Sequence, residues 1–253
     1  MSTAPLALSI QWMRSLVFVV QMYVAMAVLA LLFAAPTIVS GRHAYLGIRL
    51  YCRWVRWTAH RIAGVRSEVR GQVPSGKALI CSKHQSFFDI LIICSVVERP
   101  RFVMKKELRN VPIIGFYGRQ IGCIVVDRGT RSEAVAQMLE QAEEFDKAGG
   151  QLIIYPQGTR VSPGVSAPYK IGAALLYQRL SCTCHPAATN VGLFWPRRSI
   201  MRHAGVAVIE FLQPIQPGLP PEDFMAQLEH SIETNSDRLM KCAGFEKRRR
   251  SSP

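Results

Sequence analysis

The feature that most constrains the fold is an uncharged apolar stretch close to the N-terminus. No charged residue occurs between Arg14 and Arg42, and Gln21 is the only clearly polar residue in the run from Leu16 to Ala35. About 20 apolar residues are enough for a helix to cross the hydrocarbon core of a bilayer. We therefore expect a membrane-associated helix. The alternatives are a cleaved signal peptide, whose apolar core would be unusually long here, and a buried helix of a soluble protein.

The charges on the two sides of this run are uneven. Arg14 stands alone before it, whereas seven arginines, opposed only by Glu68, follow it: Arg42, Arg49, Arg53, Arg56, Arg61, Arg66 and Arg70. Lysine and arginine are enriched on the cytoplasmic side of membrane helices. This asymmetry predicts that the bulk of the chain lies on the cytoplasmic face of a membrane.

Residues 42–62 are predicted to form a second helix. On a helical wheel, four arginines share one narrow sector, and the neighbouring sector holds four apolar residues: Leu46, Leu50, Trp54 and Trp57. This pattern suits the lipid headgroup layer, although the solvated basic face of an ordinary helix looks the same. Pro36 is expected to separate the two helices. The sequence leaves open whether they span the bilayer or form a hairpin that dips into one leaflet.

Net charge and cysteine usage limit the possible partners. The 253 residues carry a net charge of +14, which favours an anionic membrane, an acidic substrate or nucleic acid. Nucleic acid is not expected, because aromatic residues do not interleave with the basic ones. The seven cysteines lie mostly in apolar runs, as reduced buried thiols do. Around Cys182 and Cys184 no second ligand pair occurs at zinc spacing, so neither a metal nor a cofactor is expected.

From about residue 65, strand and helix signals alternate. Strand-like runs occur near residues 78–82, 101–104, 121–126, 151–155, 186–191 and 205–211, and helical patterns fill 86–96, 130–147, 168–180 and 221–241. This alternation predicts one α/β domain over residues 65–245, with a central, largely covered sheet and flanking helices. A membrane-associated helical segment (1–64) is expected before the domain, and a basic tail (246–253) after it.

A histidine and an aspartate follow the first of these strand-like runs. If Ser86 caps a helix, His84 lies in the turn before it and Asp89 in its first helical turn, so the two side chains can meet. Asp89 would then accept the Nδ1–H of His84 and leave Nε2 free to take a proton. Alternatively, Asp89 merely completes a capping box. No serine or cysteine is clearly placed as a nucleophile, so a substrate hydroxyl is expected in that role.

Three basic residues stand at or just beyond strand-like runs: Lys105, Arg128 and Arg160. Each on its own is more often a surface charge. Together, at the ends of strands and beside a histidine, they are expected to bind a phosphate group, for which the arginine fork is well suited. Transfer chemistry on an anionic substrate fits both clusters.

Four motifs carry a resemblance to a known family. They are His84-x4-Asp89, Gly122–Arg128, Tyr155–Arg160 and His185–Asn190. In this order they resemble the motifs of the glycerolipid acyltransferases, most closely the bacterial 1-acyl-glycerol-3-phosphate type. The resemblance covers about residues 60–215. Four motifs in order are far more specific than one histidine and one aspartate.

The resemblance implies a role for each matching residue. His84 would be the general base and Asp89 its orienting partner. The other residues would bind substrate: Arg128 and Arg160 with Lys105 at the acceptor's phosphate, Gly158 and Thr159 in the turn, and Pro186 on the acyl-donor side. The implied reaction passes an acyl group from acyl-CoA or acyl carrier protein to the sn-2 hydroxyl of lysophosphatidic acid. The product would be phosphatidic acid, formed among membrane lipids at the cytoplasmic face of a bacterial inner membrane.

One position departs from the family pattern. The chain has Gln157 where the family usually has glutamate. An amide keeps hydrogen bonds but carries no charge, so Gln157 is expected to position substrate by hydrogen bonding. Three other functions stay open: acylation of another lyso-lipid such as a lyso-aminolipid, a catalytically silent lipid-binding protein, and a basic membrane anchor for an acidic partner.

Overall fold

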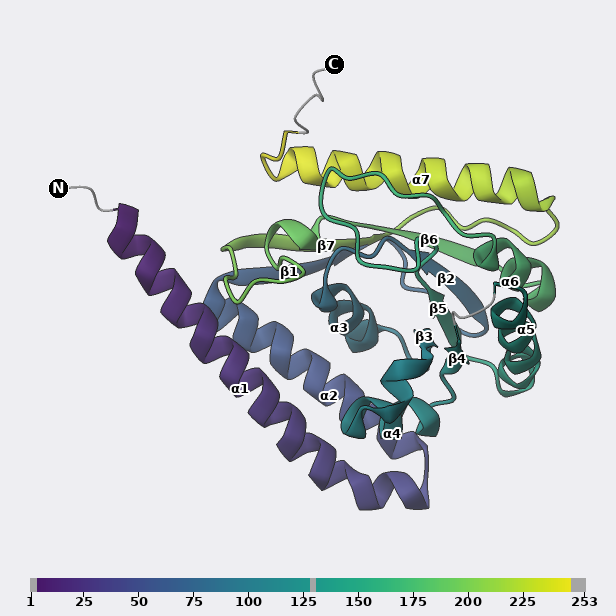
Figure 1. Ribbon diagram of the computed structural model, residues 1–253, viewed down its shortest axis with the longest axis horizontal. Coiled ribbons are helices and arrows are strands. Elements are labelled where there is room, and N and C mark those ends of the chain that lie inside the picture. Colours follow the sequence, from purple (N-terminus) through teal and green to yellow (C-terminus); the bar gives the residue numbers. More distant parts are fainter. Residues whose placement is uncertain (1–3, 128–130, 247–253) are drawn as a thin grey trace.

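The N-terminal region folds as a helical hairpin. The computed structural model describes residues 4–127 and 131–246. In it, α1 (Ala4–Val39) and α2 (Arg42–Thr58) lie side by side, and a turn of π-helix, η1 (Ala59–Ala63), continues α2 (Figure 1). The chain reverses at Ser40 and Gly41 rather than at Pro36, which lies inside α1. The helical hydrogen bonding continues past Pro36, since the carbonyl of Pro36 accepts the backbone N–H of Ser40 at 2.9 Å.

A seven-stranded sheet forms the centre of the remaining chain. Its order is β1-β7-β6-β2-β5-β3-β4, and every neighbouring pair is parallel except β6 and β7. The strands are β1 (Val65–Arg70), β2 (Ala78–Ser82), β3 (Pro100–Lys105), β4 (Ile124–Val126), β5 (Gln151–Ile154), β6 (Cys184–Thr189) and β7 (Gly205–Phe211). The predicted α/β class is confirmed: a central covered sheet with flanking helices follows an N-terminal apolar helix in the chain.

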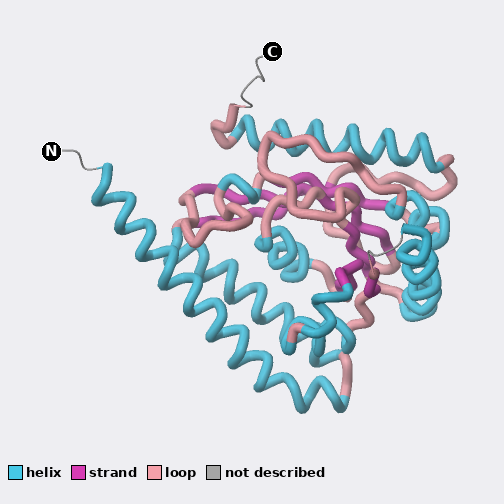
Figure 2. Tube along the Cα trace, in the orientation of Figure 1, coloured by secondary structure: helices cyan, strands magenta, loops and turns pink. Residues whose placement is uncertain are grey.

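Helices cover both faces of this sheet (Figure 2). On β2, Ile80 packs into a cluster with the hairpin and α3 (Phe87–Val96), whereas Leu79 and Cys81 pack on the opposite face. That opposite face carries three helices: α5 (Arg131–Ala148), α6 (Gly172–Leu180) and α7 (Pro221–Cys242). Successive side chains of a strand point to opposite faces, so an uninterrupted apolar strand is what a doubly covered sheet requires.

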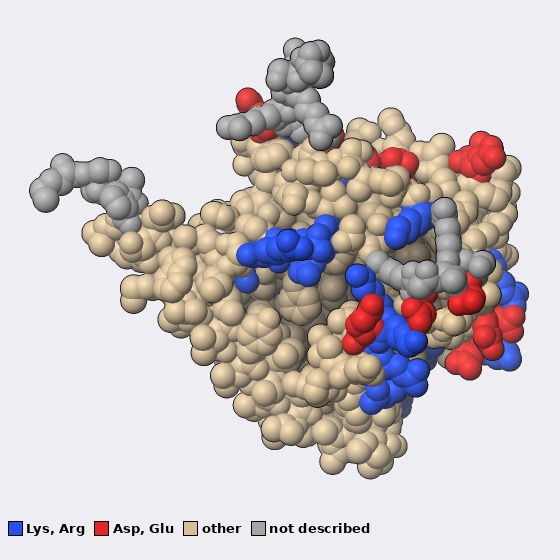
Figure 3. All heavy atoms as spheres, viewed as in Figure 1, with Lys and Arg blue, Asp and Glu red and all other residues tan. Residues whose placement is uncertain are grey.

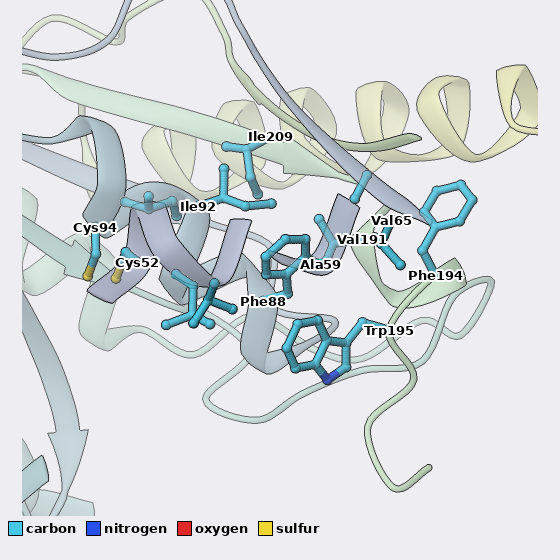
Figure 4. Packing of buried hydrophobic residues seen from close by; sticks show 14 of the residues in the cluster. Cys52, Ala59, Val65, Phe88, Ile92, Cys94, Val191, Phe194, Trp195 and Ile209 are labelled. Carbon is cyan, nitrogen blue, oxygen red and sulfur yellow. The ribbon is translucent and has the colours of Figure 1, made fainter. Parts of the chain in front are cut away.

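The hairpin packs closely on the domain. The ring of Phe18 meets Trp195 edge-on with centroids 5.3 Å apart. Trp195 in turn stacks on Phe88 at 4.8 Å, as Figure 4 shows. Near the start of α1, the side-chain amide of Gln11 donates to the carbonyls of Ala63 and Arg202, each at 2.8 Å. One side of α1 is therefore fixed to the domain.

The other side of α1 is apolar and exposed. The helix is long and apolar enough to enter a membrane, and only 11% of its most apolar stretch is buried. Leu31 and Val39 expose 78% and 86% of their surface. Such a continuous apolar surface marks a membrane or partner interface rather than a solvated helix.

Some elements are not predicted by the sequence pattern. The first is β1, which lies at the edge of the sheet and pairs only with β7. The second is α4 (Pro112–Gln120), preceded by the 3-10 helix η2 (Lys106–Asn110). The strand expected over 121–126 is shorter, because the backbone N–H groups of Ile121 and Gly122 still close the end of α4. The expected basic tail lies largely outside the described residues.

Candidate active site

A groove of about 1360 Å³ opens where β2, β3 and β5 end. The carboxyl ends of parallel strands are where α/β proteins place their ligand sites. His84 lines this groove, and so do residues of the hairpin, α4, α5 and the segment before α6. The groove is lined mostly by apolar residues, and four basic side chains also line it: Lys105, Arg160, Lys170 and Arg197.

His84 and Asp89 meet inside the protein. The Nδ1 atom of His84 lies 3.2 Å from Oδ2 of Asp89, which is completely buried. An ionised carboxylate can only accept hydrogen bonds, so this contact places the proton on Nδ1 and leaves Nε2 as the basic nitrogen. The His84 side chain keeps 13% of its surface exposed, on the side of the groove.

Asp89 also caps the helix that carries it. Its Oδ2 accepts the backbone N–H groups of Gln85 at 2.6 Å and Ser86 at 2.7 Å, and Ser86 completes a capping box at the start of α3. On its other oxygen, Asp89 accepts the hydroxyl of Thr189 at 3.3 Å. The capping role and the contact with His84 therefore coexist in one carboxylate. The hydrogen bonds fix its position beneath the imidazole.

Tyr155 holds the imidazole from the other side. The two rings stack with centroids 4.0 Å apart and planes inclined by 21°. Burial raises the pKa of the Tyr155 phenol well above its usual value, and the nearby Asp89 raises it further. The ring therefore acts as a neutral platform that restricts the rotation of His84. In the sequence, Tyr155 stands out only as the first residue of the third motif.

The turn after β5 brings the third motif to the groove. The backbone N–H of Gly158 donates to the carbonyl of Tyr155 at 2.8 Å, and Gly158 has a φ of +69°. Glycine adopts this left-handed conformation without steric cost. Thr159 and Arg160 follow at the groove, and the next residue, Val161, donates its N–H to the carbonyl of His84 at 2.8 Å. The two polar turns are thus joined by a backbone hydrogen bond.

Two arginines that line the groove, Arg160 and Arg197, lie close together. Burial lowers the pKa of Arg160, and the neighbouring Arg197 lowers it further. Arg197 also donates to the carbonyl of Arg160 at 3.1 Å. Figure 3 shows Lys and Arg side chains gathered around the hollow on this face, whereas the lower half of α1 shows none. An anion bound between these arginines would relieve their mutual repulsion.

The structure does not bring every expected site residue to the groove. Arg128 lies outside the described residues. Pro186 is buried within β6, opposite Cys81 of β2, and does not line the groove. Gln157 is also buried and turned away from the groove, toward α7. Lys170 and Arg197 do line it but were missed, because neither stands beside an apolar strand in the sequence.

Some arginines of α2 that are expected to face the lipid headgroups bind the domain instead. Arg49 donates to the carbonyl of Glu98 at 2.8 Å, and Arg56 donates to the hydroxyls of Ser67 and Ser95. These two arginines fasten the hairpin to the domain instead of facing outward. The exposed apolar residues of α2 are Leu46, Leu50, Trp54 and Trp57. Within the described residues, no group of three or more His, Cys, Asp or Glu side chains could hold a metal ion.

A groove with a largely apolar lining, several basic side chains and a histidine held by a buried aspartate fits an enzyme that acts on an amphipathic anion. The family model described as Acyltransferase matches residues 64–190. The chain is 30% identical over 175 residues to a 1-acyl-sn-glycerol-3-phosphate acyltransferase of Pseudomonas aeruginosa, covering 68% of each chain. The chain therefore belongs to the acyltransferase family, and the resemblance found in the sequence is confirmed.

Two further comparisons agree. The human 1-acyl-sn-glycerol-3-phosphate acyltransferase alpha is 28% identical over 180 residues, which cover 68% of this chain and 64% of the human one. The crystal structure of the 1-acyl-sn-glycerophosphate acyltransferase of Thermotoga maritima superimposes with a TM-score of 0.74. It covers 96% of this chain and 100% of that chain at 19% identity, so it shows the shared fold.

Proposed function

We propose that the chain transfers an acyl group from a thioester donor to the sn-2 hydroxyl of lysophosphatidic acid, giving phosphatidic acid. The observation that carries this proposal is the position of His84. Its imidazole contacts Asp89 at 3.2 Å and lines a groove whose apolar lining suits an acyl chain and whose basic side chains suit a phosphate. The names of the relatives support the same acceptor.

The proposed chemistry needs only this chain's side chains and backbone. Nε2 of His84 takes the proton of the acceptor hydroxyl while its oxygen attacks the thioester carbonyl. Asp89 stabilises the imidazolium that forms. Backbone N–H groups of the turn at Thr159 and Arg160 stabilise the oxyanion. When the tetrahedral intermediate collapses, the new C–O bond remains, the C–S bond breaks, and the proton passes from His84 to the leaving thiolate.

The four basic side chains of the groove are assigned to anion recognition. Arg160, Arg197 and Lys170, together with Lys105, would hold the acceptor's phosphate. Arg128 belongs to the same proposed set. Gly158 and Thr159 shape the turn, whereas Gln157 would act indirectly, since its side chain faces α7. Pro186 does not line the groove, so it would contribute to the donor side only indirectly, by supporting the sheet from within β6.

We further propose that the hairpin over residues 1–64 enters one leaflet without crossing the bilayer, with the domain over 65–245 on the cytoplasmic face. The support is that α1 is held at both ends. Gln11 is bonded to Ala63 and Arg202, and near the other end the hydroxyl of Tyr117 donates to the carbonyl of Ala30 at 2.8 Å. A helix that crossed the membrane would have to leave these partners. The apolar part of the groove would then open beside the lipid.

The test is acyl transfer by the detergent-purified protein. Lysophosphatidic acid is offered beside a lyso-lipid without phosphate, and acyl-CoA and acyl carrier protein donors are run separately. Formation of phosphatidic acid supports the proposal, and the faster donor identifies the thioester. Transfer only to the phosphate-free acceptor would favour the alternative of another lyso-lipid. Absence of transfer to both acceptors would favour a lipid-binding protein without catalysis.

A further inference from the structure

Lys83, the residue before His84, is a buried cation. Its side chain is 1% exposed, and its ammonium group contacts both carboxylate oxygens of Glu233, at 2.6 and 2.5 Å. Glu233 lies on α7, 150 residues further along the chain. A buried charge is strongly unfavourable without a partner, so this pair fixes the strand end that carries His84 to α7.

The same carboxylate binds two other parts of the site. The hydroxyl of Tyr169 donates to Oε1 of Glu233 at 3.0 Å, and the side-chain amide of Gln157 approaches the same oxygen at 3.4 Å. Burial raises the pKa of Tyr169 well above its usual value, and Glu233 raises it further, so the phenol stays a donor. Gln157 belongs to the turn after β5, and Tyr169 to the segment before α6.

These two parts carry groove residues. Gly158, Thr159 and Arg160 directly follow Gln157, and Lys170 directly follows Tyr169. A backbone hydrogen bond of 3.0 Å from Lys170 to the carbonyl of Pro156 joins the two segments. Glu233 itself does not line the groove. The carboxylate of Glu233 on α7 therefore connects three segments. One is the turn that carries His84, and the other two present Arg160 and Lys170 to the groove.

We propose that Glu233 is a positioning residue for the acyl-transfer site, holding His84, Arg160 and Lys170 in register through Lys83, Gln157 and Tyr169. This inference rests on the proposed function. It also gives Gln157 a role: the amide donates to a carboxylate, which a glutamate at position 157 could not do. The amide at 157 and the ammonium group of Lys83 thus share the carboxylate at 233.

The test exchanges the two groups. Glu233→Gln leaves Lys83 without its carboxylate, and Gln157→Glu places two carboxylates side by side. Each single change is expected to raise the KM for lysophosphatidic acid about tenfold, because Arg160 and Lys170 shift. The double variant Gln157→Glu/Glu233→Gln restores one carboxylate and one amide at positions 157 and 233, which contact each other. Its KM should return to within about threefold of wild type, since contacting residues are not additive. Glu222→Gln, an exposed change at the start of the same helix, is the control and should leave the KM unchanged.

Two outcomes would overturn the inference. One is an unchanged KM in Glu233→Gln, with turnover reduced only in proportion to the folded fraction. The other is a double variant whose KM equals the product of the two single effects. If the wild type acylates neither acceptor, the proposed function fails, and the coupling is then read from thermal unfolding of the same four proteins. A midpoint restored in the double variant supports the arrangement around Lys83, and additive losses refute it.

Discussion

His84 and Asp89 lie five residues apart, and their side chains still meet at 3.2 Å because a capped helix begins between them. Ser86 starts α3, so His84 stays in the extended turn while Asp89 enters the first helical turn. Asp89 also accepts the backbone N–H groups of Gln85 and Ser86 at the entry to this helix. One carboxylate thus both builds the local fold and orients the imidazole.

This dual use of Asp89 can be separated by a pair of variants. Ser86→Ala removes the serine half of the capping box and is expected to lower the free energy of unfolding by about 1 kcal/mol with little change in kcat. Asp89→Asn should lower kcat by about 10² to 10⁴, because the amide cannot stabilise the imidazolium as a carboxylate does. Chemical denaturation and single-acceptor kinetics measure the two quantities. Equal kcat values in the two variants would show that Asp89 only caps the helix and does not assist His84 in catalysis.

Arg160→Ala is expected to raise the KM for lysophosphatidic acid about 10- to 100-fold, since a hydrogen bond between charged groups contributes about 1.5–3 kcal/mol. The KM for a phosphate-free acceptor should not change. Arg179→Ala on α6, which breaks an ion pair with Glu143 away from the groove, is the matched control. If both acceptors lose affinity equally, Arg160 shapes the groove without recognising phosphate.

Gly158 should be sensitive because of its backbone conformation. An alanine in the left-handed region costs about 1–2 kcal/mol. Gly149, with a φ of +65° and no neighbour within 4 Å of an added Cβ, offers the same strain at a remote turn. Both alanine variants should lose similar stability, but only Gly158→Ala should reduce kcat/KM for the acceptor. A matching loss of activity in Gly149→Ala would show that stability alone is responsible.

The tryptophans of α2 are expected to bind lipid. Trp54 and Trp57 are 44% and 53% exposed, with ring centroids 5.3 Å apart. Replacing both by alanine should weaken binding to anionic vesicles by tenfold or more, because burying one large apolar side chain contributes about 1.5–3 kcal/mol. Vesicle flotation measures this, with the exposed Gln227→Ala on α7 as control. If flotation is unchanged, the tryptophans of α2 do not bind the membrane surface.

The sheet could be predicted from the sequence because its central strands are buried on both faces. Ile80 and Ile153 enter one cluster while Leu79 and Leu152 enter the other, so β2 and β5 read as unbroken apolar runs. The edge strand β1 has no such signal, because charged and polar residues separate the two valines of Val65–Arg70. Its pairing depends on β7, which is distant in the sequence.

The site could be predicted only where it lies next to those strands. His84, Asp89 and Arg160 follow strand ends, and the capping pattern brings the first two together. Glu233 could not be found in this way, because its contacts with Lys83 and Tyr169 depend on how α7 packs across the sheet. The inward arginines of α2 were missed for the same reason, since helical periodicity does not tell which basic residues find hydrogen-bond acceptors.

The most direct test of the central claim is acyl transfer to lysophosphatidic acid by His84→Ala beside the wild type, with circular dichroism and thermal unfolding run on both proteins. The account predicts that the variant stays folded, still binds lysophosphatidic acid, and forms no phosphatidic acid above the uncatalysed rate. A folded His84→Ala protein that transfers acyl groups at a rate near that of the wild type would contradict it.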